Sequence, residues 1–294
     1  MQTSADNSKP LVGALWMLAT GFCFVGVTAT VKVVGDSLPA AQAAFLRYVL
    51  GLVFLIPMIG PMRATRWTRE ILLLGGARGV VHTLGVAMWF FAMARIPMAE
   101  VTAMGYLTPV YVTIGAAIFL GERLAARRIA AVVAALVGAA IILRPGLREI
   151  GPGHTGMLFT AVMFAASYLL TGKLSGKIGA TAIVGMLSVT VTIGLAPLAF
   201  AVWIPPTLEQ LVWLFIVAAL ATAGHYTMTR AFAVAPLSVT QPVTFLQLVW
   251  SVLLGWALFA EAVDVWVIVG GVVIMAAASF IALREAQLRR EGRV

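Results

Sequence analysis

One apolar segment carries a stripe of residues that could bind a ligand. The stripe, at steps of four, three and four residues along a single helical face, consists of Arg78, His82, Gly85 and Trp89. Ionisable groups are costly in hydrocarbon, so they are expected to face a water-filled space or another helix. A cation, a titratable ring and a large aromatic ring suit a zwitterionic ligand with an apolar side chain. Two alternatives stay open, because Arg78 could reach the headgroups and His82 could hydrogen-bond a neighbouring helix.

Further candidates share a polar or aromatic side chain at middle depth in an apolar segment. They are Thr102, Tyr106, Ser167, Tyr168, His225, Tyr226, Gln241, Phe245 and Trp250. Aromatic rings offer faces for stacking and an apolar wall, which favours a substrate that is small, amphiphilic and not strongly charged. Helix packing is the alternative for each of them. Arg47, about two turns below a surface, either guards an entrance or pairs with a neighbour.

Composition shows which elements must position these groups. Of the 294 residues, 62% are hydrophobic and 11% charged, whereas a soluble domain is roughly half apolar and a quarter charged. A span needs about 20 apolar residues, and a mean hydropathy of +1.02 leaves room for about ten. The apolar runs lie near residues 11–32, 40–60, 71–94, 98–120, 127–144, 156–173, 180–203, 210–233, 237–259 and 264–283. These runs predict an all-α polytopic membrane protein in a bacterial-type inner membrane, because they are too long for the strands of a barrel.

The basic residues indicate how the chain is oriented. The side of the N-terminus carries thirteen: Lys9, Arg63, Arg66, Arg69, Arg123, Arg127, Arg128, Lys173, Lys177, Arg284, Arg289, Arg290 and Arg293. The opposite side carries Lys32, Arg95, Arg144 and Arg148. Short basic loops stay in the cytoplasm, so both termini are expected there. The net charge of +9 is scattered through turns, and nucleic acid is not an expected partner. Interfacial anchors are expected at Trp203, Trp213, Trp256 and Trp266.

The sequence repeats itself at a shift of 139 residues. This shift superimposes Pro97 on Pro236 and Glu122 on Glu261 without a gap. The chain is therefore interpreted as two five-helix repeats, residues 1–148 and 149–294. Because five is odd, the two copies must enter the membrane from opposite sides, as inverted repeats do in many secondary transporters. Chance similarity between two apolar helices is the alternative.

The span count, the repeat and the segment LTPVYVTIGAAIFLGE resemble the EamA domain of the drug/metabolite transporter superfamily. Within it the chain looks most like the YddG-type exporters of aromatic and other neutral amino acids. The resemblance implies export of such small molecules by alternating access through a central cavity lined by spans 4 and 9. The second copy departs from the pattern, with Ala260 at the position of Gly121 and Leu248 at that of Pro109.

Other function classes receive less support. The motifs GxxxxGK[ST], HExxH and GxSxG do not occur, so no enzyme and no ATP-driven pump is expected. A single cysteine, Cys23, allows no internal disulfide and no cysteine zinc cluster. No cofactor is expected. Another metabolite or a drug-like solute is the alternative substrate, and a scaffold or channel is a remote alternative. The expected partners are a small-molecule substrate and the lipid bilayer, with a monomer sufficient for function.

The acidic residues suggest how transport is energised. All eleven fall in loops, in tails or at helix ends, so no carboxylate is expected at mid-membrane to carry a proton. His82 or His225 would have to titrate if transport were coupled to protons. We therefore expect facilitated or weakly coupled movement.

Overall fold

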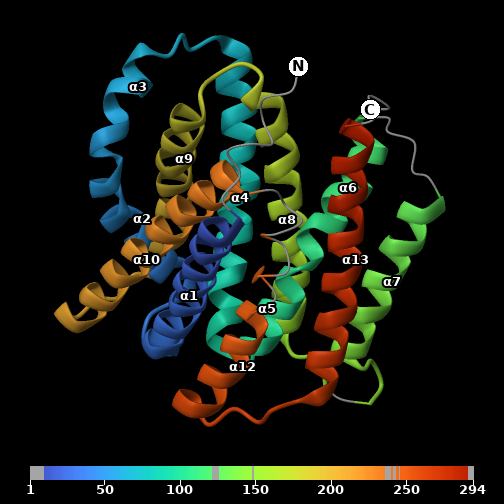
Figure 1. The fold of residues 1–294 in the computed structure, drawn as a ribbon. Coiled ribbons are helices and arrows are strands. Elements are labelled where there is room, and N and C mark those ends of the chain that lie inside the picture. The colour runs from blue at the N-terminus through green and yellow to red at the C-terminus, as the bar shows by residue number, and fades with distance from the viewer. Residues whose placement is uncertain are drawn as a thin grey trace.

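The computed structural model describes residues 10–120, 126–147, 149–235, 240, 243–244 and 246–290, with helices as its regular elements (Figure 1). In the first half they are α1 (Pro10–Val34), α2 (Ala40–Gly51), α3 (Ile59–Ala64), α4 (Arg69–Arg95), α5 (Met98–Gly105), α6 (Leu107–Leu120) and α7 (Ala126–Leu143). In the second half they are α8 (Pro152–Ser175), α9 (Ala180–Phe200), α10 (Leu208–Val234), α12 (Leu246–Phe259) and α13 (Val265–Arg290). Two 3₁₀ segments, η1 (Gly35–Ser37) and η2 (Leu52–Met58), flank α2.

The helices confirm the all-α, polytopic architecture. Among the described residues, nine helical segments are long and apolar enough to cross a membrane, and α12 is a shorter apolar helix. Each corresponds to one of the ten apolar runs. The orientation of the termini stays a prediction.

The second span is not one continuous helix. It runs from Ala40 to Ala64, but η2 separates α2 from α3 and contains Pro57. Proline has no N–H to donate to the carbonyl four residues earlier, and its ring clashes with that carbonyl. The interruption between α2 and α3 is therefore explained by the sequence.

The fourth span is also broken, at its middle. Helix α5 ends at Gly105, and the Tyr106 N–H donates to the Ala103 carbonyl in a tighter turn before α6 begins. Pro109, in the first turn of α6, cannot donate to the Gly105 carbonyl. Non-helical backbone at membrane depth is tolerated where it is buried in protein or lines a cavity, which makes the break a marker for a site.

The spans of one half pack mainly against spans of the other. Helix α1 lies along α10 and α4 lies along α8, while α2 contacts α9, α5 contacts α12 and α7 contacts α13. Figure 1 shows α1 beside α10 and α7 beside α13. Exchanging the two halves maps this set of pairs onto itself, which is what a twofold relation between repeats predicts. The boundary between residues 148 and 149 stays a prediction.

The α7–α13 contact depends on a close backbone approach. A Cβ atom at Gly138 would lie 2.8 Å from the Gly270 carbonyl oxygen, and one at Gly270 would lie 2.5 Å from the Gly138 carbonyl oxygen. Small residues allow membrane helices to approach this closely and so gain van der Waals contact. The two glycines thus mark where the last spans of the halves cross.

Candidate functional site

Part of the predicted stripe on α4 forms a polar and aromatic contact with α8. His82 Nδ1 lies 3.0 Å from the Ser167 hydroxyl, and the His82 ring stacks on Phe164 at a centroid distance of 4.9 Å. Trp89 meets the same Phe164 edge-on at 6.1 Å. A Cβ at Gly85 would lie 2.8 Å from the Phe164 ring. Gly85 therefore makes room for Phe164, which contacts both His82 and Trp89. Phe164 was not among the candidates from the sequence.

Two arginines approach this group from different helices. The Arg78 side chain is 6% exposed, and its Nη1 donates to the Ile183 carbonyl of α9 at 3.1 Å. Its buried Nε has no hydrogen-bond partner. The Arg47 guanidinium lies over the Tyr48 ring at 4.2 Å and interacts electrostatically with His82. Arg78 is thus buried between helices rather than extended to the headgroups.

Tyr168 and His225 indicate where open space lies inside the bundle. Tyr168 is 52% exposed, yet it is deeply enclosed and interacts with Arg78 and with Tyr48. His225 is exposed as well and lies within electrostatic range of Arg47. Its Nδ1 lies 2.7 Å from the Ala221 carbonyl oxygen. From side chains that are accessible although helices surround them, we infer an internal space. This space is bordered by α2, α4, α8 and α10 and is called the central cavity below.

An aromatic and cationic cluster lies between α1 and α10. Trp16 and Tyr226 meet edge-on at 6.3 Å, and the Arg230 guanidinium lies 5.5 Å from the Trp16 ring centroid. Arg230 also donates to the Tyr226 hydroxyl at 3.1 Å. Cations bind favourably over aromatic faces, with Trp the best partner. Arg230 was missed from the sequence, although it lies within an apolar span one turn after Tyr226, and this spacing would have been a sufficient signal.

Other sequence candidates serve contacts between helices. The Thr102 and Ser251 hydroxyls lie 2.7 Å apart and are buried, and the Tyr106 hydroxyl donates to the Thr244 carbonyl at 3.1 Å. Trp250 packs against Phe22 with ring centroids 4.8 Å apart. These contacts join the broken fourth span and α1 to the ninth span. Two further candidates, Gln241 and Phe245, lie outside the described residues.

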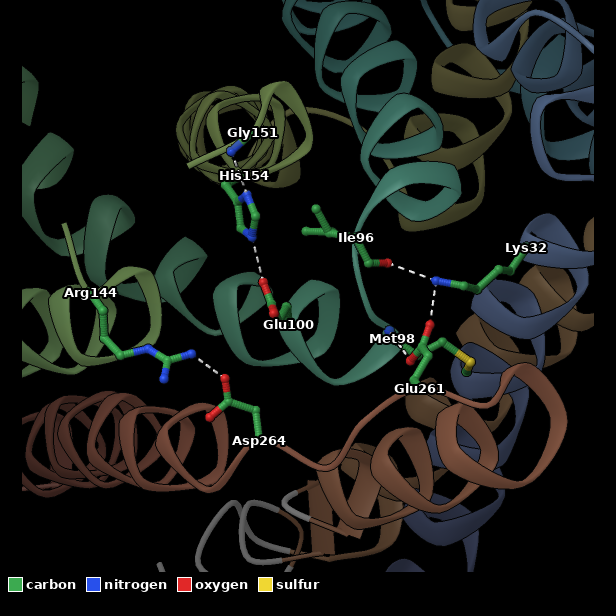
Figure 2. A network of polar contacts seen from close by, with 9 residues as sticks. All are labelled: Lys32, Ile96, Met98, Glu100, Arg144, Gly151, His154, Glu261 and Asp264. Carbon is green, nitrogen blue, oxygen red and sulfur yellow. Dashed lines mark hydrogen bonds and ion pairs between the residues drawn. The ribbon is translucent and has the colours of Figure 1, made fainter. Parts of the chain in front are cut away.

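A second polar network lies at the end of the bundle where α4 ends and α13 begins (Figure 2). Lys32, near the end of α1, forms an ion pair with Glu261 and donates to the Ile96 carbonyl at 2.9 Å. Glu261 Oε2 also accepts from the Met98 N–H at 2.9 Å and so caps the start of α5. One carboxylate thereby links α1, α5 and the segment after α12.

Two more pairs extend this network across the halves. Arg144 after α7 pairs with Asp264 before α13. His154 of α8 accepts from the Gly151 N–H through Nδ1, so its Nε2 carries the proton and donates to Glu100 at 2.6 Å. Glu100 is only 3% exposed although it lies at a helix end, as the sequence predicts. His154 was not among the sequence candidates. We call these three pairs the outer-end network, following the predicted orientation.

The architecture and the polar interior define a polytopic helical membrane protein, and comparison with known proteins identifies its family. The model of the EamA-like transporter family matches residues 11–144 and again residues 151–283. The chain belongs to this family. Family and relatives are membrane transporters of small molecules rather than enzymes.

Several curated relatives align over nearly the whole chain. A riboflavin transporter of Rhizobium johnstonii is 32% identical over 99% of this chain and 97% of its own length. The pseudopaline exporter CntI of Pseudomonas aeruginosa is 27% identical over 90% and 94%. An S-adenosylmethionine uptake transporter of Rickettsia bellii is 24% identical over 86% and 87%.

The fold is also similar to that of a protein solved by crystallography, a similarity that supports the fold alone. That protein is 19% identical, covers 95% of this chain and 97% of its own, and superimposes with a TM-score of 0.58. The comparisons support the EamA expectation from the sequence. They do not support the narrower expectation of amino-acid export, because none of the relatives described above is named for amino acids.

Proposed function

We propose that this protein is a secondary transporter that moves an organic metabolite with a planar aromatic ring, and that riboflavin is the first candidate. The relative named for riboflavin is the observation that carries this choice, because it is 32% identical and both chains align almost completely. The alternative named from the sequence, a metabolite other than an amino acid, therefore fits better than amino-acid export.

The distribution of aromatic side chains supports a flat, amphiphilic substrate. A continuous group of rings beside the central cavity consists of His82, Phe164 and Trp89. Tyr168 exposes its phenol and His225 its imidazole to the same cavity. Stacked or edge-on contacts with such rings stabilise a planar ligand beyond the area they bury. Polar groups among them orient the ligand, as in most small-molecule sites.

Amino-acid export stays the second candidate because of the stripe on α4. His82 and Trp89 present a polar ring and an apolar surface to one region, which also suits a neutral or aromatic amino acid. The two candidates differ in size and are separated by direct transport measurements.

The proposal is tested with purified protein in liposomes. Wild-type protein is expected to move riboflavin, followed by its fluorescence, faster than empty liposomes do, with little change when a pH gradient is imposed. Labelled phenylalanine and threonine are measured in parallel. Amino-acid flux without riboflavin flux would overturn the riboflavin proposal in favour of the second candidate, and a strict need for a pH gradient would contradict weak coupling.

A matched pair of tryptophan variants connects the flux to the site. Trp89→Ala is expected to lower riboflavin flux by about tenfold, since one lost stacking contact contributes about 1 kcal/mol and cavity shape adds to it. Trp256→Ala is the control, because Trp256 is 62% exposed and is a predicted interfacial anchor. Equal flux in the two variants would remove Trp89 from the site.

A further inference from the structure

We propose that the central cavity binds an anionic group, a carboxylate or a phosphate, of the transported molecule between Arg47 and Arg78. This inference rests on the proposed transport function and names the charge of the substrate. It departs from the expectation of a substrate that is not strongly charged. Because riboflavin carries no carboxylate or phosphate, it favours an anionic flavin such as riboflavin 5′-phosphate over riboflavin itself.

The first argument is the lack of a counter-charge. Arg47 contacts the Tyr48 ring, and Arg78 contacts one backbone carbonyl. Among the described residues neither arginine forms an ion pair. The Arg78 Nε is buried without a hydrogen-bond partner. A guanidinium has five donors in a fixed fork that matches carboxylate and phosphate oxygens, and most of those of Arg78 remain available.

The second argument is depth. Arg47 is seven residues into α2 and Arg78 is nine residues into α4, which at 1.5 Å per residue places them roughly 10 and 14 Å along the axis from the first residues of their helices. His82 lies within electrostatic range of both. Cations at this depth are expensive and mark substrate pathways in membrane proteins. An anion between them would neutralise the charge that the protein leaves uncompensated.

The third argument is the contrast with the outer-end network. There each buried or half-buried carboxylate has a basic partner: Lys32 with Glu261, His154 with Glu100 and Arg144 with Asp264. The fold therefore gives each of these carboxylates a cationic or hydrogen-bonding partner where it holds helices together. The central cavity, bordered by Arg47, Arg78 and two histidines, lacks such pairing in the described part of the chain.

The hydroxyls around the arginines complete a site for oxygen anions. Tyr48 and Tyr168 both lie near Arg78, and each can donate an O–H to a ligand oxygen. Hydrogen bonds to charged groups are roughly twice as strong as neutral ones. The arrangement thus offers two guanidinium groups and two phenol donors to one anionic group.

Thermal stability of the purified protein in detergent tests anion binding directly. Inorganic phosphate and citrate, compared with chloride at equal ionic strength, are expected to raise the Tm of the wild type. Arg47→Gln and Arg78→Gln are expected to abolish the shift, whereas Arg47→Lys and Arg78→Lys retain part of it. Lys177→Gln is the control. Lys177 is an exposed cation that pairs with Glu70 outside the central cavity, so its variant should keep the full shift in Tm.

The outcome of this test decides the inference. A shift present in wild type and lost in both glutamine variants supports it. A wild type without a shift for either anion, or glutamine variants that keep the shift, would overturn it. Variants that fail to fold are replaced by the lysine variants, for which an unchanged affinity for both anions would also count against the site.

Transport of two matched flavins separates this inference from the proposed function. Riboflavin and riboflavin 5′-phosphate share the ring and differ in the anionic group. The ratio of riboflavin 5′-phosphate flux to riboflavin flux is expected to exceed one in the wild type and to fall about tenfold or more in Arg78→Gln. A wild-type ratio of one or less, or an unchanged ratio in the variant, would overturn the place of the anionic group in the transported molecule. Absence of flux for both flavins would overturn the proposed substrate, while the anion-dependent Tm shift would still stand as the evidence for the anion site.

Discussion

The Thr102 hydroxyl forms a hydrogen bond with the Ser251 hydroxyl instead of lining a cavity. Thr102 and Ser251 are both buried, and their oxygens are 2.7 Å apart. Thr102 was a candidate for substrate binding with helix packing as the alternative. The geometry favours packing, because the hydrogen bond joins the fourth and ninth spans. Interhelical hydrogen bonds of this kind average about 0.6 kcal/mol in membranes and reach about 1.7 kcal/mol.

A double-mutant cycle on this pair separates packing from binding. Thr102→Val, Ser251→Ala and the double variant are expected to show a coupling of about 0.6 to 1.7 kcal/mol in the free energy of unfolding. Unfolding in detergent with increasing denaturing surfactant provides the measurement. Flux per folded protein should stay near wild type. A tenfold drop in flux with no coupling would instead assign Thr102 to the substrate.

The sequence predicted candidate residues for the site but not the contacts between them. His82 and Ser167 were separate candidates, but 85 residues separate them along the chain, so only the packing of α4 on α8 reveals their hydrogen bond. Phe164 was not distinguished from other apolar residues, because its importance comes from lying between His82 and Trp89. His154 lies between the predicted apolar runs 127–144 and 156–173, so the search for polar groups within apolar runs did not include it.

At the scale of elements, the crossing of α7 and α13 places a tight constraint on the backbone. The atoms that face Gly138 are the Gly270 carbonyl oxygen and Ile274 atoms of α13. A carbonyl in a helix cannot move aside as a flexible side chain can. Adding one methyl group here must therefore push the helices apart or bend one of them.

Gly138→Ala is expected to destabilise the protein by about 1 to 3 kcal/mol, the usual cost of overpacking. Gly172→Ala is the matched control, because a Cβ at Gly172 of α8 would meet nothing within 4 Å and alanine favours helix. Thermal midpoints in detergent compare the two. Equal midpoints would show that the crossing adapts without cost.

The breaks within spans were only partly predictable. Pro57 and Pro109 are visible in the sequence, yet the second and fourth spans were each predicted as one uninterrupted run. Hydropathy measures only how apolar a segment is, and η2 and the turn at Tyr106 are as apolar as their surroundings. Whether a proline kinks a helix or ends it depends on the neighbours that satisfy the freed carbonyls.

At the scale of the whole molecule, we expect the outer-end network to act as a latch, that is, to hold this end of the bundle closed. Lys32, Glu100 and Arg144 belong to the first half, and their partners Glu261, His154 and Asp264 belong to the second. Opening this end requires the three pairs to separate. Many transporters built from two repeats alternate between states in which one end or the other is open. On the same mechanism, we expect the pairs to bias the molecule toward closure at this end.

Lys32→Met is expected to increase opening of this end. The test places a cysteine at Ala99, which lies beside Glu261, in a Cys23→Ala background. Its labelling by a maleimide should accelerate about tenfold, because a half-buried pair is lost and Glu261 is left without its cation. Lys177→Met is the control, since the Lys177–Glu70 pair is exposed and such pairs contribute little. The latch would be rejected if both variants labelled at the wild-type rate.

The pairing of spans across the two halves has a consequence for the biogenesis of the protein. Helix α1 packs along α10, α4 along α8 and α7 against α13. The first five spans therefore leave the ribosome before the helices against which they pack have been synthesised. Arg78 and His82 then enter the bilayer before Ile183 and Ser167, their hydrogen-bond partners, have been synthesised. The early chain must be shielded by the insertion machinery or by other membrane proteins. A repeat that is a unit in the sequence is thus not an independent folding unit in the membrane.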